Sequence, residues 1–304
     1  MIRITVLGSG SSIPTFERWH PSIALELFYD KYFLLLFDCG EGTQIRLMQA
    51  GISFMRINFI LISHWHADHF AGLIPLLQSM QLEGRSEKLF LIAPDAKEMF
   101  EKIKSLYYYK LKFPVEAIDA KEGLIFENEY FRIYGLKTIH TVTSFAYKIE
   151  EKEKWKIDEK KLEILGLKRG RWIEELKRIG KVRINDREVK IEDVANLIKG
   201  KIIVYSGDTA FDENMVDFSK DADFLIHEAT FLEKDKKGRE DYMHTSVLEA
   251  AKIAKEAKVK NLIIFHLSRR YQEEDLKEIE EEIKKVFDGK FFIAKDLLKI
   301  DERG

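Results

Sequence analysis

A ligand-rich segment follows an apolar run in the first quarter of the chain. In order, the run and the segment read Ile60, Leu61, Ile62, Ser63, His64, Trp65, His66, Ala67, Asp68 and His69. The apolar run predicts a buried strand, so the polar residues lie on the loop that leaves its end. Side chains alternate along an extended loop, so His64 and His66 point the same way, and Asp68 and His69 turn toward a second point. This spacing predicts a site for two metal ions and is unlike a chance group of surface residues.

Residue types that can bind metals also follow three later apolar strands. They are His140 after residues 131–139, Asp208 after residues 202–205 and His266 after residues 262–265. An isolated Asp or His at a strand end is usually a capping or surface residue. Three in chain order after a ligand-rich loop indicate a shared site, because function in α/β folds concentrates at strand ends. Imidazole and carboxylate groups suit Zn²⁺ or Mn²⁺, and two such ions can clamp a phosphate or polarise a carbonyl.

Short apolar strands alternate with helical stretches over most of the chain, which predicts an α/β fold. Strands are expected at residues 2–7, 22–28, 32–37, 57–62, 89–93, 131–139, 145–149, 202–205, 224–226 and 262–265. Helices are expected between Gly40 and Gly51, over residues 72–82, and from Pro94 toward Tyr107. A chain of 304 residues holds one large domain or two small ones.

The composition changes at Glu150, and charged residues dominate as far as Gly200. The sequence therefore predicts one body formed by residues 1–149 and 201–304, with residues 150–200 inserted as a protruding arm. A disordered linker is the alternative, but Trp155, Trp172 and the apolar residues between them favour an ordered unit.

The arm also carries a local excess of positive charge. Between Lys168 and Lys190 there are nine basic and four acidic residues, a local charge of +5 in a chain of net charge −2. An ordinary solvated charged helix is one interpretation. The excess of one sign beside Trp172 favours contact with phosphates instead. The candidate contacts are Lys168, Arg169, Arg171, Lys177 and Arg178.

The overall composition narrows the class of protein. Charged residues make up 34% of the chain, against about 25% in an average soluble protein, and Gln and Asn are sparse, as in thermophilic proteins. The single cysteine, Cys39, excludes an internal disulfide and fits a reducing cytoplasm. No apolar run approaches the roughly 20 residues that span a membrane, so we expect a cytoplasmic protein without a membrane partner.

The full ligand order resembles that of the metallo-β-lactamase fold. This resemblance implies an α/β sandwich of two mixed sheets with outer helices (αββα). It implies two Zn²⁺ ions per subunit, with Mn²⁺ as an alternative. The implied ligands are His64, His66 and His140 for one ion, Asp68, His69 and His266 for the other, and Asp208 as the bridge.

Further stretches resemble the motifs of ribonuclease Z, the tRNA 3′-processing endonuclease family. They are residues 7–18, 37–44, 227–230, 243–246 and 265–271. The stretch from His227 to Thr230 matches that family's His-Glu-Ala-Thr motif letter for letter, whereas His244-Thr245-Ser246 stands where the family usually has His-Ser-Thr. The insertion lies where the family carries its tRNA-gripping arm, but it lacks the common Gly-Pro-rich tip.

The second resemblance implies a metal-dependent endoribonuclease that removes 3′ trailers from precursor tRNA and leaves a 3′-hydroxyl, acting as a homodimer. Asp68 is expected to bind a metal and to orient or deprotonate the attacking water. His244, outside the ligand series, is expected to contact the scissile phosphate or protonate the leaving oxygen. Glu228 is expected to hydrogen-bond a histidine and fix its tautomer.

Other polar residues near these motifs are interpreted from the residues alone. His227 is expected equally as a buried residue or a substrate contact. His20 is expected to be a plain loop residue, and Asp38 to accept backbone hydrogen bonds beneath the metal loop.

Two other functions fit parts of the sequence. A small-molecule hydrolase of the same fold, such as an arylsulfatase or a cyclic-nucleotide phosphodiesterase, would share every metal ligand. It would gain nothing from a protruding basic arm. A non-catalytic RNA-binding module on a degenerate hydrolase fold would not need to keep all the ligands.

Overall fold

The structure is a computed structural model that describes residues 1–106, 111–184 and 187–302. Within these residues it contains two mixed sheets of seven strands each. In spatial order the first sheet consists of β18 (Lys299–Glu302), β1 (Ile2–Gly8), β2 (Ser22–Phe28), β3 (Tyr32–Phe37), β4 (Ile57–Leu61), β5 (Leu89–Ala93) and β6 (Val115–Asp119). The second sheet consists of β17 (Lys290–Ile293), β16 (Asn261–Phe265), β15 (Phe224–Glu228), β14 (Ile202–Tyr205), β9 (Ser144–Glu151), β8 (Phe131–Thr138) and β7 (Gly123–Glu127).

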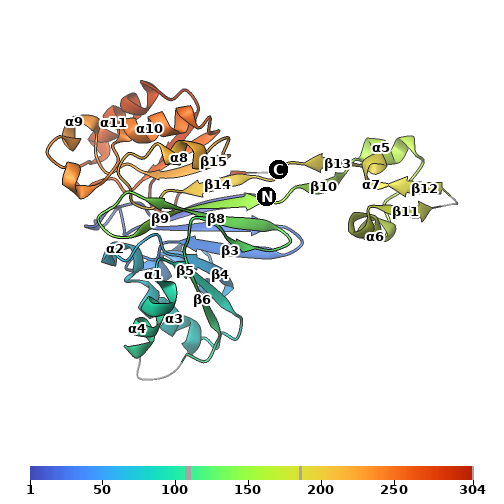
Figure 1. The fold of residues 1–304 in the computed structure, drawn as a ribbon, viewed down its shortest axis with the longest axis horizontal. Coiled ribbons are helices and arrows are strands. Elements are labelled where there is room, and N and C mark those ends of the chain that lie inside the picture. Colours follow the sequence, from blue (N-terminus) through green and yellow to red (C-terminus); the bar gives the residue numbers. More distant parts are fainter. Residues whose placement is uncertain (107–110, 185–186, 303–304) are drawn as a thin grey trace.

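The two sheets pack face to face, and helices cover both outer faces (Figure 1). Strand β2 shows the pattern behind this arrangement, since Ile23, Leu25 and Leu27 enter the core between the sheets while Ala24 faces the helices. The helices on the first sheet are α1 (Thr43–Gln49), α3 (Leu73–Leu82) and α4 (Ala96–Ser105). Those on the second sheet are α8 (Asn214–Phe218), α10 (Val247–Glu256) and α11 (Leu276–Lys284). The predicted αββα sandwich is confirmed.

Short helices occupy several connections between these elements. They are α2 (Ala67–Phe70), α9 (Glu233–Lys236) and the 3₁₀ turns η1 (Phe54–Arg56), η2 (Glu240–Tyr242) and η3 (Glu273–Asp275). Helix α2 lies inside the ligand-rich segment, so Asp68 and His69 sit on a helical turn and not on a continuing extended loop.

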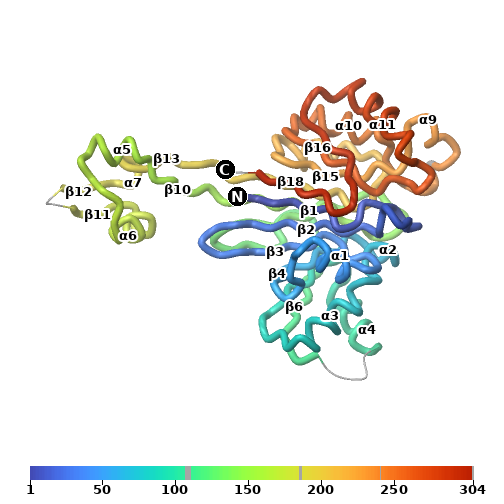
Figure 2. The backbone as a smooth tube through the Cα atoms, turned by 180° about the vertical axis from the view of Figure 1, so that it is seen from behind, coloured from blue at the N-terminus to red at the C-terminus, as the bar shows by residue number. Residues whose placement is uncertain are grey.

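Residues between β9 and β14 leave the body as a separate projecting unit (Figures 1 and 2). Its stalk is the antiparallel pair β10 (Lys154–Ile157) and β13 (Ala195–Ile198). Beyond the stalk lie α5 (Glu159–Ile164), α6 (Trp172–Ile179), the paired strands β11 (Lys181–Ile184) and β12 (Arg187–Lys190), and α7 (Ile191–Val194). These elements share a small core of their own that includes Leu162, Leu176, Val189 and Val194.

The first and last strands, β1 and β18, lie side by side near the root of the stalk (Figure 2), and Ile2 is opposite Glu302. In the part of the chain that the structure describes, no helix has both the length and the apolar character needed to cross a membrane.

Candidate metal centre and active site

The predicted metal ligands lie close together at the carboxyl ends of strands from both sheets, and four of the seven line one cavity. Strand β4 leads into the segment with His64 and His69, β14 leads to Asp208, and β16 leads to His266. His140 comes from the loop between β8 and β9. The cavity has a volume of about 400 Å³ and is lined in part by His66, Asp68, Asp208, His244 and His266.

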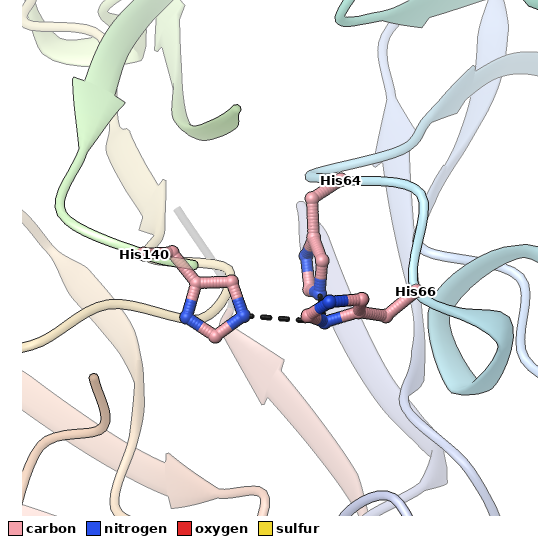
Figure 3. Close-up of side chains that lie close together, drawn as sticks. All are labelled: His64, His66 and His140. Carbon is pink, nitrogen blue, oxygen red and sulfur yellow. Dashed lines mark hydrogen bonds between the residues drawn. The ribbon is translucent and has the colours of Figure 1, made fainter. Parts of the chain in front are cut away.

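Three histidines form the first group of potential ligands. His64 Nε2 lies 2.9 Å from His66 Nδ1, and His140 Nε2 lies 3.3 Å from the same atom. Figure 3 shows the three rings facing one another, two from the loop after β4 and one from the loop after β8. Burial lowers the pKa of His64 well below its usual value and also lowers the pKa of His66 and of His140. The imidazoles are therefore neutral, which is the form that binds a metal.

The second group joins two histidines to two carboxylates. Asp208 Oδ2 lies 3.3 Å from His69 Nε2 and 3.3 Å from His266 Nε2. Asp68 Oδ2 lies 3.4 Å from His69 Nε2 and 3.6 Å from His266 Nε2. Asp208 Oδ2 is also 3.9 Å from His64 Nε2, so this carboxylate lies between the two groups, where a bridging ligand belongs.

Several of these atoms are buried without a hydrogen-bond partner in the described part of the chain. They are His69 Nε2, His266 Nε2 and Asp208 Oδ1. A buried polar atom without a partner costs about 1–3 kcal/mol, so three of them within the linked ligand groups fit a site that is completed by bound cations. The donor set of imidazoles and carboxylates is the one that Zn²⁺ or Mn²⁺ takes.

The charge of the second group also fits a site that holds bound cations. Burial alone would lower the pKa of His69, but the carboxylates of Asp208 and Asp38 raise it well above its usual value. The clustered carboxylates therefore attract positive charge, which a proton on His69 or a divalent cation can supply.

The non-ligating nitrogens of the histidines are held by neighbouring side chains. Asp38 Oδ2 accepts from His69 Nδ1 at 2.6 Å and from the Tyr205 hydroxyl at 2.5 Å. Thr230 Oγ1 lies 2.8 Å from His266 Nδ1. Such contacts fix the tautomer and the orientation of a ligand. The sequence interpretation missed these roles of Asp38, Tyr205 and Thr230, and their closeness to the motifs was the only signal for them.

Asp38 also accepts a backbone hydrogen bond beneath the metal loop, as the sequence predicted. Its Oδ1 accepts from the backbone N–H of Ser63 at 2.7 Å. The glycine before Asp208 permits the expected close approach. Gly207 has φ +57°, and a Cβ there would lie 2.6 Å from the Cβ of Ser63.

His244 and Glu228 form a hydrogen-bonded pair at the edge of the metal cavity. His244 Nδ1 lies 2.8 Å from Glu228 Oε1, and the Glu228 side chain is fully buried. Burial alone would lower the pKa of His244, but Glu228 and Asp208 raise it to about 9. The hydrogen bond to Glu228 orients the His244 ring, and the neighbouring carboxylates favour its protonated form.

The two remaining histidines, His227 and His20, differ in whether they line the metal cavity. His227 is buried, its Nδ1 lies 2.7 Å from the carbonyl oxygen of Glu228, and it does not line the metal cavity. His20 is more than the plain loop residue that the sequence suggested, because it lines the cavity together with Glu41. Its place there depends on the path of the loop before β2, which no local pattern reveals.

The basic residues proposed as phosphate contacts are all exposed on the projecting unit. Lys168, Arg169 and Arg171 lie between α5 and α6, and Lys177 and Arg178 lie on α6. Arg169 Nε donates to Glu159 at 2.5 Å, so its charge is partly balanced within the arm.

Comparison with known proteins gives matches over nearly the whole chain. Residues 2–287 match the family model described as anti-Pycsar protein Apyc1. The chain is 37% identical to ribonuclease Z of Methanosarcina mazei, over 99% of this chain and 98% of that protein. It is 38% identical to ribonuclease Z of Sulfurisphaera tokodaii, over 98% of this chain and 97% of that protein.

Solved structures give the same fold. The metallo-β-lactamase-fold protein YhfI of Bacillus subtilis superposes with a TM-score of 0.70 at 25% identity, covering 98% of each chain. The short form of human tRNase Z superposes with a TM-score of 0.69 at 24% identity, again covering 98% of each chain. These matches place the chain in the family that the Apyc1 model describes, and they show that it belongs to the ribonuclease Z family of metallo-β-lactamase-fold proteins.

Proposed function

We propose that this protein is an endoribonuclease that cuts precursor tRNA at the 3′ end and releases the trailer. The observation that carries the proposal is a set of linked groups of potential metal ligands beside one cavity and the His244–Glu228 pair, in a chain of the ribonuclease Z family. The ligands are His64, His66, His140, Asp68, His69, His266 and Asp208.

The ligand geometry supports two metal ions per subunit. His64, His66 and His140 would hold one, Asp68, His69 and His266 would hold the other, and Asp208 would bridge them. Zinc is the metal that this donor set favours, with manganese as the alternative. When bound, such ions supply Lewis acidity, which lowers the pKa of water to roughly 7 and offsets phosphate charge.

The residues beside the metal ligands account for the two proton transfers that hydrolysis needs. Asp68 is only partly buried and faces the cavity, so its carboxylate can orient the attacking water and accept its proton. As the bond between phosphorus and the tRNA 3′-oxygen breaks, that oxygen needs a proton, and protonated His244 can donate it. Glu228 keeps His244 charged and in place. The products are a tRNA 3′-hydroxyl and a trailer with a 5′-phosphate.

Residues 150–200 form the proposed tRNA-binding arm. The charge excess and exposure of Lys168, Arg171, Lys177 and Arg178 support this role, because RNA helices are recognised largely through their backbone and shape. The arm also argues against the alternative of a small-molecule hydrolase, since a separately folded projection with its own core contributes nothing to binding a small substrate.

We also propose that the protein is a homodimer in the cytoplasm. Phe16, Ile45 and Met48 are large, apolar and exposed, and Phe16 and Ile45 line one hollow beside the metal cavity. An exposed apolar patch of this kind is typical of a protein interface. The buried, single Cys39 and the RNA substrate support the location. Sedimentation of the protein and of Phe16→Asp tests the dimer, which the substitution should dissociate.

The proposed activity is tested by incubating the protein with a 3′-extended precursor tRNA and Zn²⁺ or Mn²⁺, then mapping the products. We expect one cut at the 3′ end of the mature tRNA that a chelator abolishes. A protein that leaves the precursor intact but hydrolyses small phosphate or sulfate esters would support the small-molecule alternative.

A further inference from the structure

A buried carboxylate near the C-terminus joins segments that are far apart in the chain. Asp296 lies between β17 and β18, and its side chain is 6% exposed. Its Oδ1 accepts from the backbone N–H and the hydroxyl of Ser9, at 2.9 and 2.7 Å. Its Oδ2 accepts from the backbone N–H of Trp19 at 2.9 Å and from Arg46 Nη2 at 2.9 Å.

Arg46 contacts the same region. Its guanidinium carbon lies 5.3 Å from the centre of the Trp19 ring, and its Nε donates to the carbonyl of Leu7 at 3.0 Å. Asp296 and Arg46 thus fix both ends of the loop from Gly10 to Trp19. Because the pair is buried, removing either partner leaves the other charge without compensation.

This loop forms one wall of the reaction site. Ser12 lines the metal cavity. Thr15, Phe16 and Trp19 line the adjoining hollow of about 750 Å³, which shares His20 and Glu41 with the metal cavity. The position of the loop therefore sets the shape of the metal cavity at Ser12 and of the hollow beside it.

The start of the loop also touches the last metal ligand. The carbonyl of Ser9 accepts from the backbone N–H of His266 at 3.0 Å, and Gly10 pairs with Leu267. His266 has φ +62°, a left-handed conformation that a residue with a Cβ adopts at a cost and keeps only when its surroundings enforce it. The Ser9 that Asp296 holds supplies one of those constraints.

We propose that Asp296, with Arg46, is a positioning residue that holds the Gly10–Trp19 loop as the substrate-side wall of the site and holds His266 in its strained conformation. The expected effect on cleavage rests on the proposed function, whereas the expected effect on the loop and on His266 does not. Asp296 touches neither the cavity's metal ligands nor the reacting atoms, and it acts through Ser9 and Trp19.

The test compares Asp296→Ala and Asp296→Asn with Glu26→Ala. Glu26 is a matched control because it is also a nearly buried carboxylate, bonded to the Tyr32 hydroxyl at 2.9 Å and close to Arg3, and it lines no cavity described above. The asparagine keeps one acceptor oxygen, which can serve Ser9 or Trp19 but not both, and it removes the charge that balances Arg46.

Two readouts are measured on each full-length variant. The first is amide hydrogen exchange of peptides that contain Ser9 and Trp19, without RNA. The second is the pair of constants kcat and KM for a precursor tRNA, together with the melting temperature. We expect Asp296→Ala to speed exchange at both amides and to lower kcat/KM at least tenfold. Asp296→Asn should recover part of both losses, and Glu26→Ala should lower the melting temperature without changing either readout.

Two results would overturn the proposal. One is unchanged exchange in the loop of Asp296→Ala. The other is a loss of kcat/KM in Glu26→Ala as large as in Asp296→Ala at a similar melting temperature, which would mean that Asp296 matters only for stability. If Asp296→Ala does not fold, Arg46→Gln takes its place with the same expectations. Failure of the intact protein to cut precursor tRNA would refute the proposed function but leave the exchange result to decide the role of Asp296.

Discussion

The metal cavity and the projecting arm hold their polar side chains in opposite ways. In the cavity, His69 and His266 are buried, and each is fixed through its second nitrogen by Asp38 or Thr230. In the arm, the basic side chains are exposed, and the core beneath them is small. Bond breaking needs reacting groups held to within a fraction of an ångström. Attraction between a basic surface and an RNA backbone needs only charge in the right region. The two regions therefore suit separate tasks, and the predictions below test that separation.

The largest effect is expected from removing a ligand in the cavity. Asp68→Ala and His66→Ala should each lower cleavage of precursor tRNA by about 10³-fold or more, because metal ions contribute several kcal/mol to such reactions. Circular dichroism should show a native fold, and the metal content should fall. Substantial activity in either variant with its full metal content would contradict the ligand assignment.

His244→Ala should produce the next largest loss. We expect turnover to fall by about 10²-fold, the usual contribution of a general acid, with the metal content unchanged. Metal analysis beside single-turnover kinetics checks this. A variant that loses metal would show that His244 is a ligand.

Neutralising the arm should weaken binding and leave the cavity intact. Changing Lys168, Arg169 and Arg171 together to Gln should lower tRNA affinity and flatten its dependence on salt. The slope of log affinity against log salt should fall by up to about 0.7–0.9 for each phosphate that the variant no longer neutralises. The control changes Lys255, Lys277 and Lys284, which are exposed on the outer helices α10 and α11. Equal losses of affinity in both triple variants would mean that the arm has no special role.

The smallest effect on chemistry is expected from disrupting the core of the arm. Leu176 is fully buried in that core, and Leu176→Ala should cost about 2–5 kcal/mol of local stability. We expect an earlier unfolding transition confined to the arm, with hydrolysis of a small diester unchanged. Loss of diester hydrolysis would show that the arm and the cavity are coupled. Leu76→Ala in the body is the matched control, since Leu76 is equally buried against the first sheet.

The fold was predictable where apolar patterns were strong. Strands such as β4 and β16 end in short apolar runs, and the candidate ligands that follow them stand in a recognisable order. Strands β6 and β7 were missed because their side chains are mostly exposed or half-buried, and acidic residues interrupt β6 and end β7. Strand β18 was missed for a similar reason, since Lys299, Asp301 and Glu302 make up most of it.

Within the candidate site, the sequence pointed to the proposed ligands and to His244, but only partly to the residues that orient them. The bond from Tyr205 to Asp38 joins residues 167 positions apart, and the bond from Ser9 to Asp296 joins residues 287 positions apart. Such contacts arise from the packing of two sheets on each other, and the sequence around each residue gives no indication of its partner. The position of His20 in the cavity lining was missed for the same reason.

The most direct test of the separation compares two substrates on one variant. Residues Lys154 to Ile198 are replaced by a short Gly-Ser linker, which removes the whole projecting unit with its stalk. Rates are then measured for precursor tRNA and for bis(p-nitrophenyl) phosphate, with the intact protein and Asp68→Ala in parallel. We predict that the intact protein hydrolyses both substrates, that Asp68→Ala hydrolyses neither, and that the arm-deleted protein keeps its rate on the diester while its kcat/KM for tRNA collapses. An arm-deleted protein that cuts precursor tRNA as well as the intact one would contradict the account.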